Sequence, residues 1–236
     1  MLLRDNIYRA IRHSILTCEY GPGQDLREQV LAEFYHVSRS PIRDSLLRLE
    51  HENLVTVLPR QGYRVKDVCP ADVEEIYGLR LVIEPACAAG AARRDGAAVS
   101  TLDAFRDYAD DGSVFGSFGE YNQAFHNAVS SLSGNKRLTA VAHDLVAQFD
   151  RLVRIIFLDD QTVRTKPAAR EHDLMIAAIQ AHDADTAARL AYEHVDGART
   201  RALTILRGRG TPSGKLNGRM AVNGHNRTSH TFSPRK

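Results

Sequence analysis

The sequence has few cysteines and no long apolar run. Its three cysteines, Cys18, Cys69 and Cys87, are odd in number and lack metal-ligand spacing, and they predict small buried side chains in a reducing compartment. No apolar stretch reaches the length of about 20 residues that spans a bilayer, and the first residues lack a signal-peptide hydrophobic region. We therefore expect a cytoplasmic globular protein.

Excess charge of either sign is also lacking, because the net charge of the 236 residues is only +2. Residues 1–68 carry ten basic and nine acidic side chains, residues 69–206 carry fourteen and twenty, and residues 207–236 carry seven and none. Gross charge therefore cannot support a nucleic-acid interface, which needs an argument from placed residues. The composition, 43% hydrophobic and 25% charged, is ordinary for a soluble protein with a core.

Residues 1–68 show the pattern of three helices followed by a β-hairpin. Isoleucine recurs every four residues at Ile7, Ile11 and Ile15, which predicts an amphipathic helix over 5–18. Further helices are predicted over 27–35 and 38–53. Their expected buried side chains are Val30, Leu31 and Phe34 in the first, and Ile42, Leu46, Leu47 and Leu49 in the second.

Punctuation residues mark the ends of these elements. Ser38 followed by Pro41 is typical of a helix start, and Asn53 tolerates the left-handed conformation that ends a helix. The β-prone runs 54–58 and 63–65 flank a Pro/Gly turn and predict a hairpin. Together they predict a compact winged helix-turn-helix of a size that folds alone.

The remainder of the chain predicts no strand. Alanine-rich amphipathic stretches predict an all-α bundle, with helices near 71–94, 99–109, 117–132, 135–158, 168–182 and 184–206. Residues 207–236 are polar and basic, and they predict a disordered tail. The predicted fold class is mainly α, with boundaries at 1–68, 69–206 and 207–236.

The helix-turn-helix offers a set of DNA contacts. Its second helix enters the major groove, where arginine suits bidentate contact with guanine. Arg39 and Arg43 lie one turn apart near the start of that helix, and Ser38 and Ser40 suit phosphate. At the tip of the wing the predicted contacts are Arg60, Gln61 and Gly62, the glycine allowing close approach to the sugar-phosphate chain. We predict that a dimer binds an inverted repeat of double-stranded DNA.

Three of the ten histidines form a pattern with one asparagine. Asn122 and His126 lie four apart on one predicted helix, while His172 and His194 lie on two others. Helices of a bundle can direct such side chains to one interior point. Three imidazoles and an oxygen donor suit Zn²⁺ or Ni²⁺, with Mn²⁺ less favoured.

Residues 21–65 resemble the GntR family of bacterial regulators. The resemblance rests on Pro22-Gly23, Leu26-x-Glu28-x-x-Leu31-Ala32, Val37-Ser38-Arg39-Ser40-Pro41-Ile42-Arg43, Leu49-Glu50 and Leu54-Val55. Two positions depart from the family pattern, since His36 and Asn53 each replace a usual glycine. Asn53 can serve equally well as a helix cap, whereas His36 is expected to strain or shift the turn.

Residues 70–206 resemble the FCD ligand-binding domain of the FadR subfamily. The matching residues are Arg80-x-x-x-Glu84, Asn122-x-x-Phe125-His126, Ser133-Gly134-Asn135, Glu171-His172 and His194. The resemblance implies that three histidines, His126, His172 and His194, bind a metal beside a small carboxylate effector. Asn122 stands at an aspartate position, and Arg80 faces the pocket or pairs with Glu84.

The sequence thus predicts an effector-responsive repressor that is not an enzyme. One alternative is a metal-dependent hydrolase that uses the three histidines, with Glu171 as general base. Against it, Glu171 adjoins His172 and should point about 100° away around the helix. The other alternative is a regulator with a purely structural metal.

Overall fold

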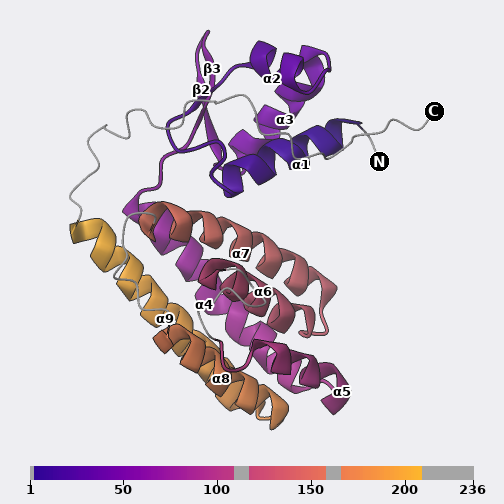
Figure 1. Ribbon diagram of the computed structural model, residues 1–236, viewed down its shortest axis with the longest axis vertical. Helices are drawn as coiled ribbons and strands as arrows, with labels where there is room; N and C mark the ends of the chain where they lie inside the picture. Colours follow the sequence, from indigo (N-terminus) through magenta and orange to yellow (C-terminus); the bar gives the residue numbers. More distant parts are fainter. Residues whose placement is uncertain (1–2, 109–116, 158–165, 209–236) are drawn as a thin grey trace.

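The computed structural model describes residues 3–108, 117–157 and 166–208, so most of the predicted tail lies outside the described residues. A small N-terminal unit sits at one end of a helical bundle (Figure 1). The elements in order are α1 (Leu3–Leu16), β1 (Asp25–Leu26), α2 (Glu28–Phe34), α3 (Arg39–His51), β2 (Val55–Leu58), β3 (Gly62–Val65), α4 (Pro70–Ala92), α5 (Gly96–Val99), the 3₁₀ helix η1 (Ser100–Phe105), α6 (Phe118–Ser131), α7 (Lys136–Phe157), α8 (Lys166–Gln180) and α9 (Ala184–Gly208). The predicted fold class, mainly α with a winged helix-turn-helix, is confirmed.

The N-terminal unit has an apolar core of its own. The isoleucines of α1 pack there with the stripe of α3, namely Ile7, Ile11, Ile15, Ile42, Leu46 and Leu49. The predicted hairpin forms, with β2 and β3 antiparallel and Val57 opposite Tyr63. The strand β1 pairs with the other edge of β3, a contact that the sequence analysis missed because two residues leave no readable pattern.

Three apolar side chains predicted to be buried are instead exposed. Val30 and Phe34 of α2 are 58% and 68% exposed, and Leu47 of α3 is 40% exposed. Helix α2 has only seven residues and buries the neighbouring Leu31 and Ala32 instead. Because successive residues lie 100° apart around a helix, one short helix cannot bury both faces.

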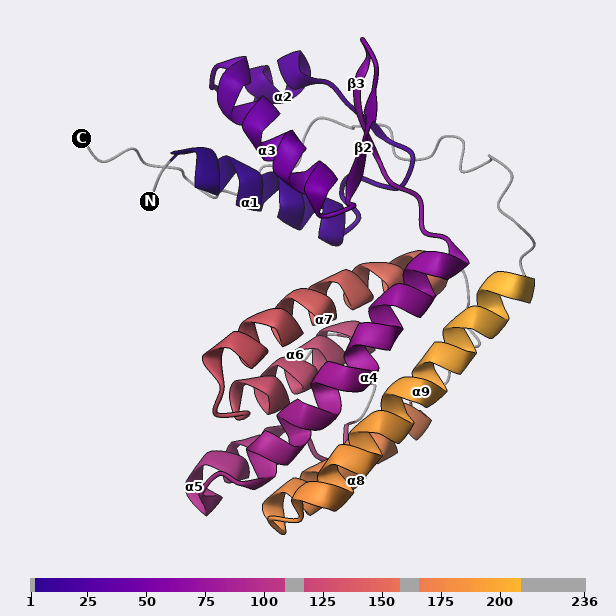
Figure 2. The same cartoon turned by 180° about the vertical axis from the view of Figure 1, so that it is seen from behind.

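The bundle places α4 and α9 side by side (Figure 2). The prediction of one helix over 99–109 was wrong. The chain there forms α5 and η1, and Arg106 then turns to an extended conformation with ψ 153°. Only Cys87 of the three cysteines is buried, and all three are free. Among the described residues, no helix is long and apolar enough to cross a membrane.

The two units touch through α1 and α7 (Figures 1 and 2). Arg12 of α1 pairs with Asp144 of α7 and also donates from Nε to Glu52, just after α3, at 2.7 Å. Arg151 of α7 donates to the backbone carbonyl of Lys66 in the segment between the units. One helix of the bundle therefore contacts both the N-terminal unit and its connection.

Candidate nucleic-acid interface and metal centre

The predicted contact residues of α3 lie on the surface at its start. Ser38 occupies the N-cap with φ −69° and ψ 166°, and its hydroxyl makes no cap hydrogen bond. Ser40, Arg39 and Arg43 are exposed on the first turn and a half. Four polar side chains are thus available at the end of the helix that enters a major groove in such motifs.

One carboxylate of α2 contacts both arginines. Glu28 accepts from Nε and Nη2 of Arg43 at 2.8 Å and 2.9 Å, and from Nη2 of Arg39 at 3.1 Å. The hydrogen bond from Arg43, together with that from Arg39, lowers the pKa of Glu28. The sequence analysis did not identify this role of Glu28, although the residue lies within the family signature.

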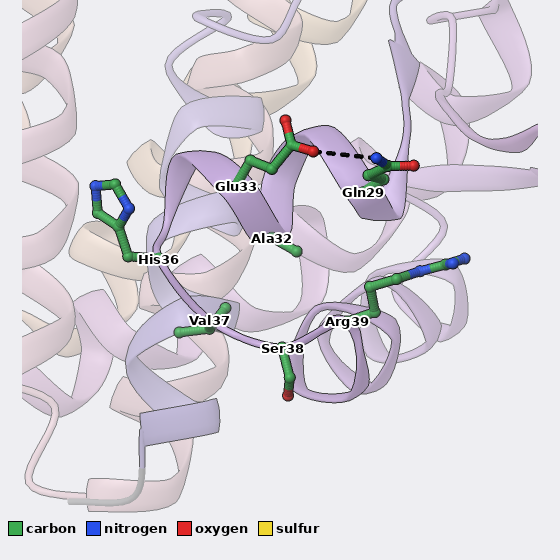
Figure 3. Close-up of a pocket in the computed structure, with 7 residues that line it drawn as sticks. All are labelled: Gln29, Ala32, Glu33, His36, Val37, Ser38 and Arg39. Atoms are coloured by element: carbon green, nitrogen blue, oxygen red, sulfur yellow. Dashed lines mark hydrogen bonds between the residues drawn. The ribbon is translucent and has the colours of Figure 1, made fainter.

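The turn between α2 and α3 contains the first departure from the family pattern. His36 has φ 55°, a left-handed conformation that glycine adopts at less cost. Its exposed side chain borders a surface pocket lined by Gln29, Ala32, Glu33, His36, Val37, Ser38 and Arg39, and points away from Arg39 (Figure 3). Asn53 has φ 57°, as expected for its cap position. Both glycine replacements therefore lie where the backbone is left-handed.

The wing carries two exposed polar side chains at its turn, Arg60 and Gln61. Arg60 has φ 66°, which directs the turn into β3. Gly62 has φ 119°, and a Cβ atom there would lie 2.8 Å from the carbonyl oxygen of Leu26. The glycine thus has a structural reason, close packing against β1, besides the approach to DNA expected from the sequence.

The bundle brings the three predicted histidines together. His126 of α6, His172 of α8 and His194 of α9 are buried, and their candidate ligand atoms all lie within 4.8 Å of one another. The Nε2 atoms of His172 and His194 are 3.3 Å apart. Three helices distant in sequence therefore converge on one interior point.

Each of these imidazoles has an oxygen partner at Nδ1. His126 contacts Glu84 at 2.9 Å, and His194 contacts Glu171 at 2.6 Å. His172 lies 3.1 Å from the hydroxyl of Tyr121, which itself donates to a backbone carbonyl. These acceptors favour a proton on Nδ1 and a lone pair on Nε2, the arrangement that carboxylate partners give metal-binding histidines.

The cluster has the charge state and the open valence that a cation needs. Burial lowers the pKa of His126 and lowers that of His172 well below the usual value, so both rings are neutral. Nε2 of His126 is buried and has no hydrogen-bond partner among the described residues. Two lone pairs facing each other across 3.3 Å repel unless a cation lies between them. The residues present therefore fit a divalent metal.

The oxygen ligand expected from the sequence lies on the same helix as one of the histidines. Asn122 is half-buried one turn before His126 on α6. The geometry brings the three histidines together, and the role of Asn122 stays a prediction.

Arg80 is fully buried beside the cluster. Its Nε donates to Glu84, so the predicted ion pair forms, and its guanidinium lies 3.8 Å from the ring centroid of Phe149. Burial raises the pKa of Glu84, but Arg80 and His126 outweigh this effect and lower it. Nη1 and Nη2 of Arg80 are buried without a partner among the described residues. Such unpaired donors are costly and point to an anion.

The sequence analysis missed the side chains that orient the histidines. Glu84 is four residues from Arg80 and reads as its partner alone, whereas it also contacts His126. Glu171 indeed points away from His172, and it meets His194 on α9 instead. It contacts the ring nitrogen opposite the ligand atom, which does not suit a general base.

Comparisons with known proteins agree with this geometry. The family of bacterial regulatory proteins described as gntR matches residues 3–65, and the FCD domain matches residues 75–197. An HTH-type transcriptional regulator of Streptomyces ambofaciens is 35% identical over 155 residues, covering 64% of this chain and 65% of that protein. The HTH-type transcriptional repressor RspR of Escherichia coli (strain K12) is 24% identical over 201 residues, covering 82% and 86%.

A solved structure shows the same fold. Escherichia coli McbR/YncC superposes with a TM-score of 0.71 at 20% identity, over 86% of this chain and 98% of that one. The coverage of curated relatives varies, because the chain spans between about half and two thirds of the length of the first relatives it matches.

Proposed function

The chain belongs to the GntR family of bacterial regulatory proteins that carry an FCD domain, and we propose that it is an effector-responsive repressor that binds an inverted-repeat operator as a dimer. The observation that carries the proposal is the exposed pair Arg39 and Arg43 on the first turns of α3, beside a wing with Arg60 at its turn. Ser38, Ser40, Gln61 and Gly62 complete the proposed DNA contacts.

The test for DNA binding begins with a random library of duplexes. The full chain is used to select from this library, and affinity for the recovered operator is compared with affinity for scrambled duplexes by fluorescence anisotropy. We expect a two-fold symmetric consensus, because two-fold proteins read two-fold sites. Recovery of no consensus would remove the proposal.

The helical domain is the proposed site of dimerisation. Leu79 and Val82 of α4 are 55% and 69% exposed on one face of that helix, and apolar side chains so exposed favour a protein interface. Val82→Glu should shift the sedimentation coefficient from dimer to monomer. An unchanged coefficient would place the interface elsewhere.

The three-histidine cluster is the proposed centre for a divalent metal, Zn²⁺ or Ni²⁺ foremost and Mn²⁺ next. His126, His172 and His194 would hold it, with Asn122 as the fourth ligand. A tetrahedral site with Zn–N bonds of about 2.0–2.1 Å separates its ligand atoms by about 3.3–3.4 Å, and the Nε2 atoms of His172 and His194 are 3.3 Å apart. When bound, the metal would supply a Lewis-acidic point for a carboxylate oxygen.

The proposed effector is a small carboxylate that reaches Arg80. The unpaired Nη1 and Nη2 atoms of Arg80 are the donors that support this choice. Calorimetry with metal-loaded protein tests it directly. Binding of a metal that raises the unfolding temperature, without binding of any carboxylate, would favour the alternative of a structural metal.

Helix α7 is the proposed link between effector and DNA. It carries Phe149, against which Arg80 packs, and also Asp144, which pairs with Arg12. Arg12 in turn contacts Glu52 at the end of α3. We propose that an effector at Arg80 shifts α7 and thereby the spacing of the two DNA-binding units.

A further inference from the structure

A second arginine approaches the histidine cluster from α9. Nη2 of Arg201 lies 3.8 Å from Oε2 of Glu171, the same oxygen that contacts Nδ1 of His194. The order histidine, glutamate, arginine repeats the arrangement in which Arg80 contacts Glu84 and Glu84 contacts a histidine. The cluster thus has two arginines, each behind a glutamate.

The two arginines differ in exposure. Arg80 is fully buried, whereas the side chain of Arg201 is 48% exposed and that of Glu171 is 35% exposed. Arg201 therefore lies on the solvent side of the cluster, where an entering ligand would meet it first.

A glycine in the middle of α9 makes room for this arrangement. A Cβ atom at Gly197 would lie 3.2 Å from Nη1 of Arg201, so the guanidinium folds back over the glycine toward the cluster. Glycine is unfavourable inside a helix because it loses more backbone entropy than alanine does. Its presence at residue 197 is explained by the space that Arg201 occupies.

The two arginines also act on one phenol. Burial raises the pKa of Tyr77 to about 12, and the positive charges of Arg80 and Arg201 both oppose this rise. The Cζ atom of Arg80 lies 5.3 Å from the ring centroid of Tyr77. Both guanidinium groups therefore approach the same region between α4 and α9.

The charges around the cluster indicate what would neutralise it. Arg80 and Arg201 balance Glu84 and Glu171, the histidines that show a pKa shift are neutral, and the proposed ligand Asn122 adds no charge. A bound divalent metal would leave two positive charges in a partly buried site. A ligand with two negative charges compensates them best, because uncompensated charge is costly away from water.

We propose that Arg201 is a second anion-binding residue and that the effector is a small dicarboxylate, with one carboxylate at Arg80 and the metal and the other at Arg201. The inference rests on the proposed function of the cluster as a metal-assisted carboxylate site. It adds the class of ligand and the residue that selects it.

The experiment compares acids that differ only in their second carboxylate. Full-length protein loaded with Zn²⁺ is titrated by calorimetry with succinate and butyrate, and with malate and 3-hydroxybutyrate. The wild-type protein should bind each dicarboxylate more tightly than its partner. Arg201→Gln should weaken dicarboxylate binding by about tenfold, as expected for a lost charge-assisted hydrogen bond, and leave the monocarboxylates unchanged.

Two further variants separate the role of Arg201 from general effects. Gly197→Ala introduces a Cβ atom against the guanidinium while raising helix propensity, so it should fold and lose part of the preference. Arg199→Gln is the matched control, because Arg199 lies on the same helix and pairs with Asp196 and Glu74 instead. It should keep the full preference.

The outcomes distinguish the two levels of the proposal. A dicarboxylate preference that persists in Arg201→Gln, or that is missing from the wild-type protein while monocarboxylates bind, overturns the inference and leaves the carboxylate site standing. Failure of every acid to bind the Zn²⁺-loaded protein removes the proposed carboxylate effector and the inference with it.

Discussion

The carboxylate of Glu28 accepts two hydrogen bonds from the guanidinium of Arg43, at 2.8 Å from Nε and 2.9 Å from Nη2. This bidentate pair joins the two helices of the helix-turn-helix and uses the same donors that would read a guanine. Arg43 is thus oriented before DNA arrives, and it must exchange or share its partner when it binds a base.

Glu28→Gln should reduce discrimination between the operator and scrambled duplexes. The change removes the acceptor that orients Arg43 and Arg39, and it also removes a negative charge near the phosphates. Affinity for scrambled DNA should therefore rise while the ratio of the two affinities falls. Glu33→Gln is the control, since Glu33 lies on the same helix and contacts Gln29 instead. An unchanged ratio in Glu28→Gln would contradict the orienting role.

Arg43→Ala should weaken operator binding by about 1–3 kcal/mol and relax the sequence preference, as expected for loss of a bidentate base contact. Anisotropy titrations with operator and scrambled duplexes measure both effects. Arg48→Ala should have little effect on preference, because Arg48 lies farther along α3 and packs on Tyr8. Equal losses on both duplexes would make Arg43 a phosphate contact.

Asn122→Asp should tighten metal binding in the absence of effector by about tenfold, because a carboxylate adds the negative charge that the site lacks. The same change should shrink the mutual enhancement of metal and carboxylate binding, which is reciprocal by linkage. Gln123→Glu adds the same charge on the same helix and serves as the control. If metal affinity is unchanged, Asn122 is not a ligand, and if His126→Ala is silent too, the cluster is not a metal site.

The metal-free protein should lose stability as the pH falls below about 6.5. Burial lowers the pKa of His126 and His172, so the unfolded chain takes up protons in a range where the folded protein does not. Each such proton lowers the free energy of unfolding by up to about 1.4 kcal/mol per pH unit. Glutamates and aspartates titrate at lower pH and stay out of this window.

Urea denaturation at several pH values between 7.5 and 5 measures this dependence. His172→Gln should reduce the slope of stability against pH, whereas His13→Gln, at an exposed position of α1, should not. A slope identical in both variants would mean that His172 does not supply it.

Arg12→Ala should weaken the link between effector and DNA. Arg12 contacts both Asp144 of α7 and Glu52 after α3, so its loss uncouples the bundle from the N-terminal unit. The shift in operator affinity on adding effector, typically about 1–3 kcal/mol in coupled sites, should fall toward zero. Asp144→Asn should act in the same direction without altering the DNA-binding unit, and a full shift in both variants would exclude this route.

Much of the fold is readable because its determinants are local. The isoleucine spacing predicts α1, Ser38 and Pro41 predict the start of α3, and Asn53 predicts its left-handed end. Each of these features depends on residues within a few positions of one another. The exposed Val30 marks the limit of such reasoning, because an apolar residue on a short helix does not reveal which face the rest of the protein covers.

The order of the elements, the residues available at the start of α3 and the three histidines follow from the amino-acid sequence without any coordinates. The partners that these side chains meet follow only from how the elements pack. Glu171 adjoins His172 in the chain yet contacts His194 on another helix, and Gly62 is required by the carbonyl of Leu26 on a strand that no pattern announced. Such pairings arise between elements far apart in sequence, and no local spacing encodes them.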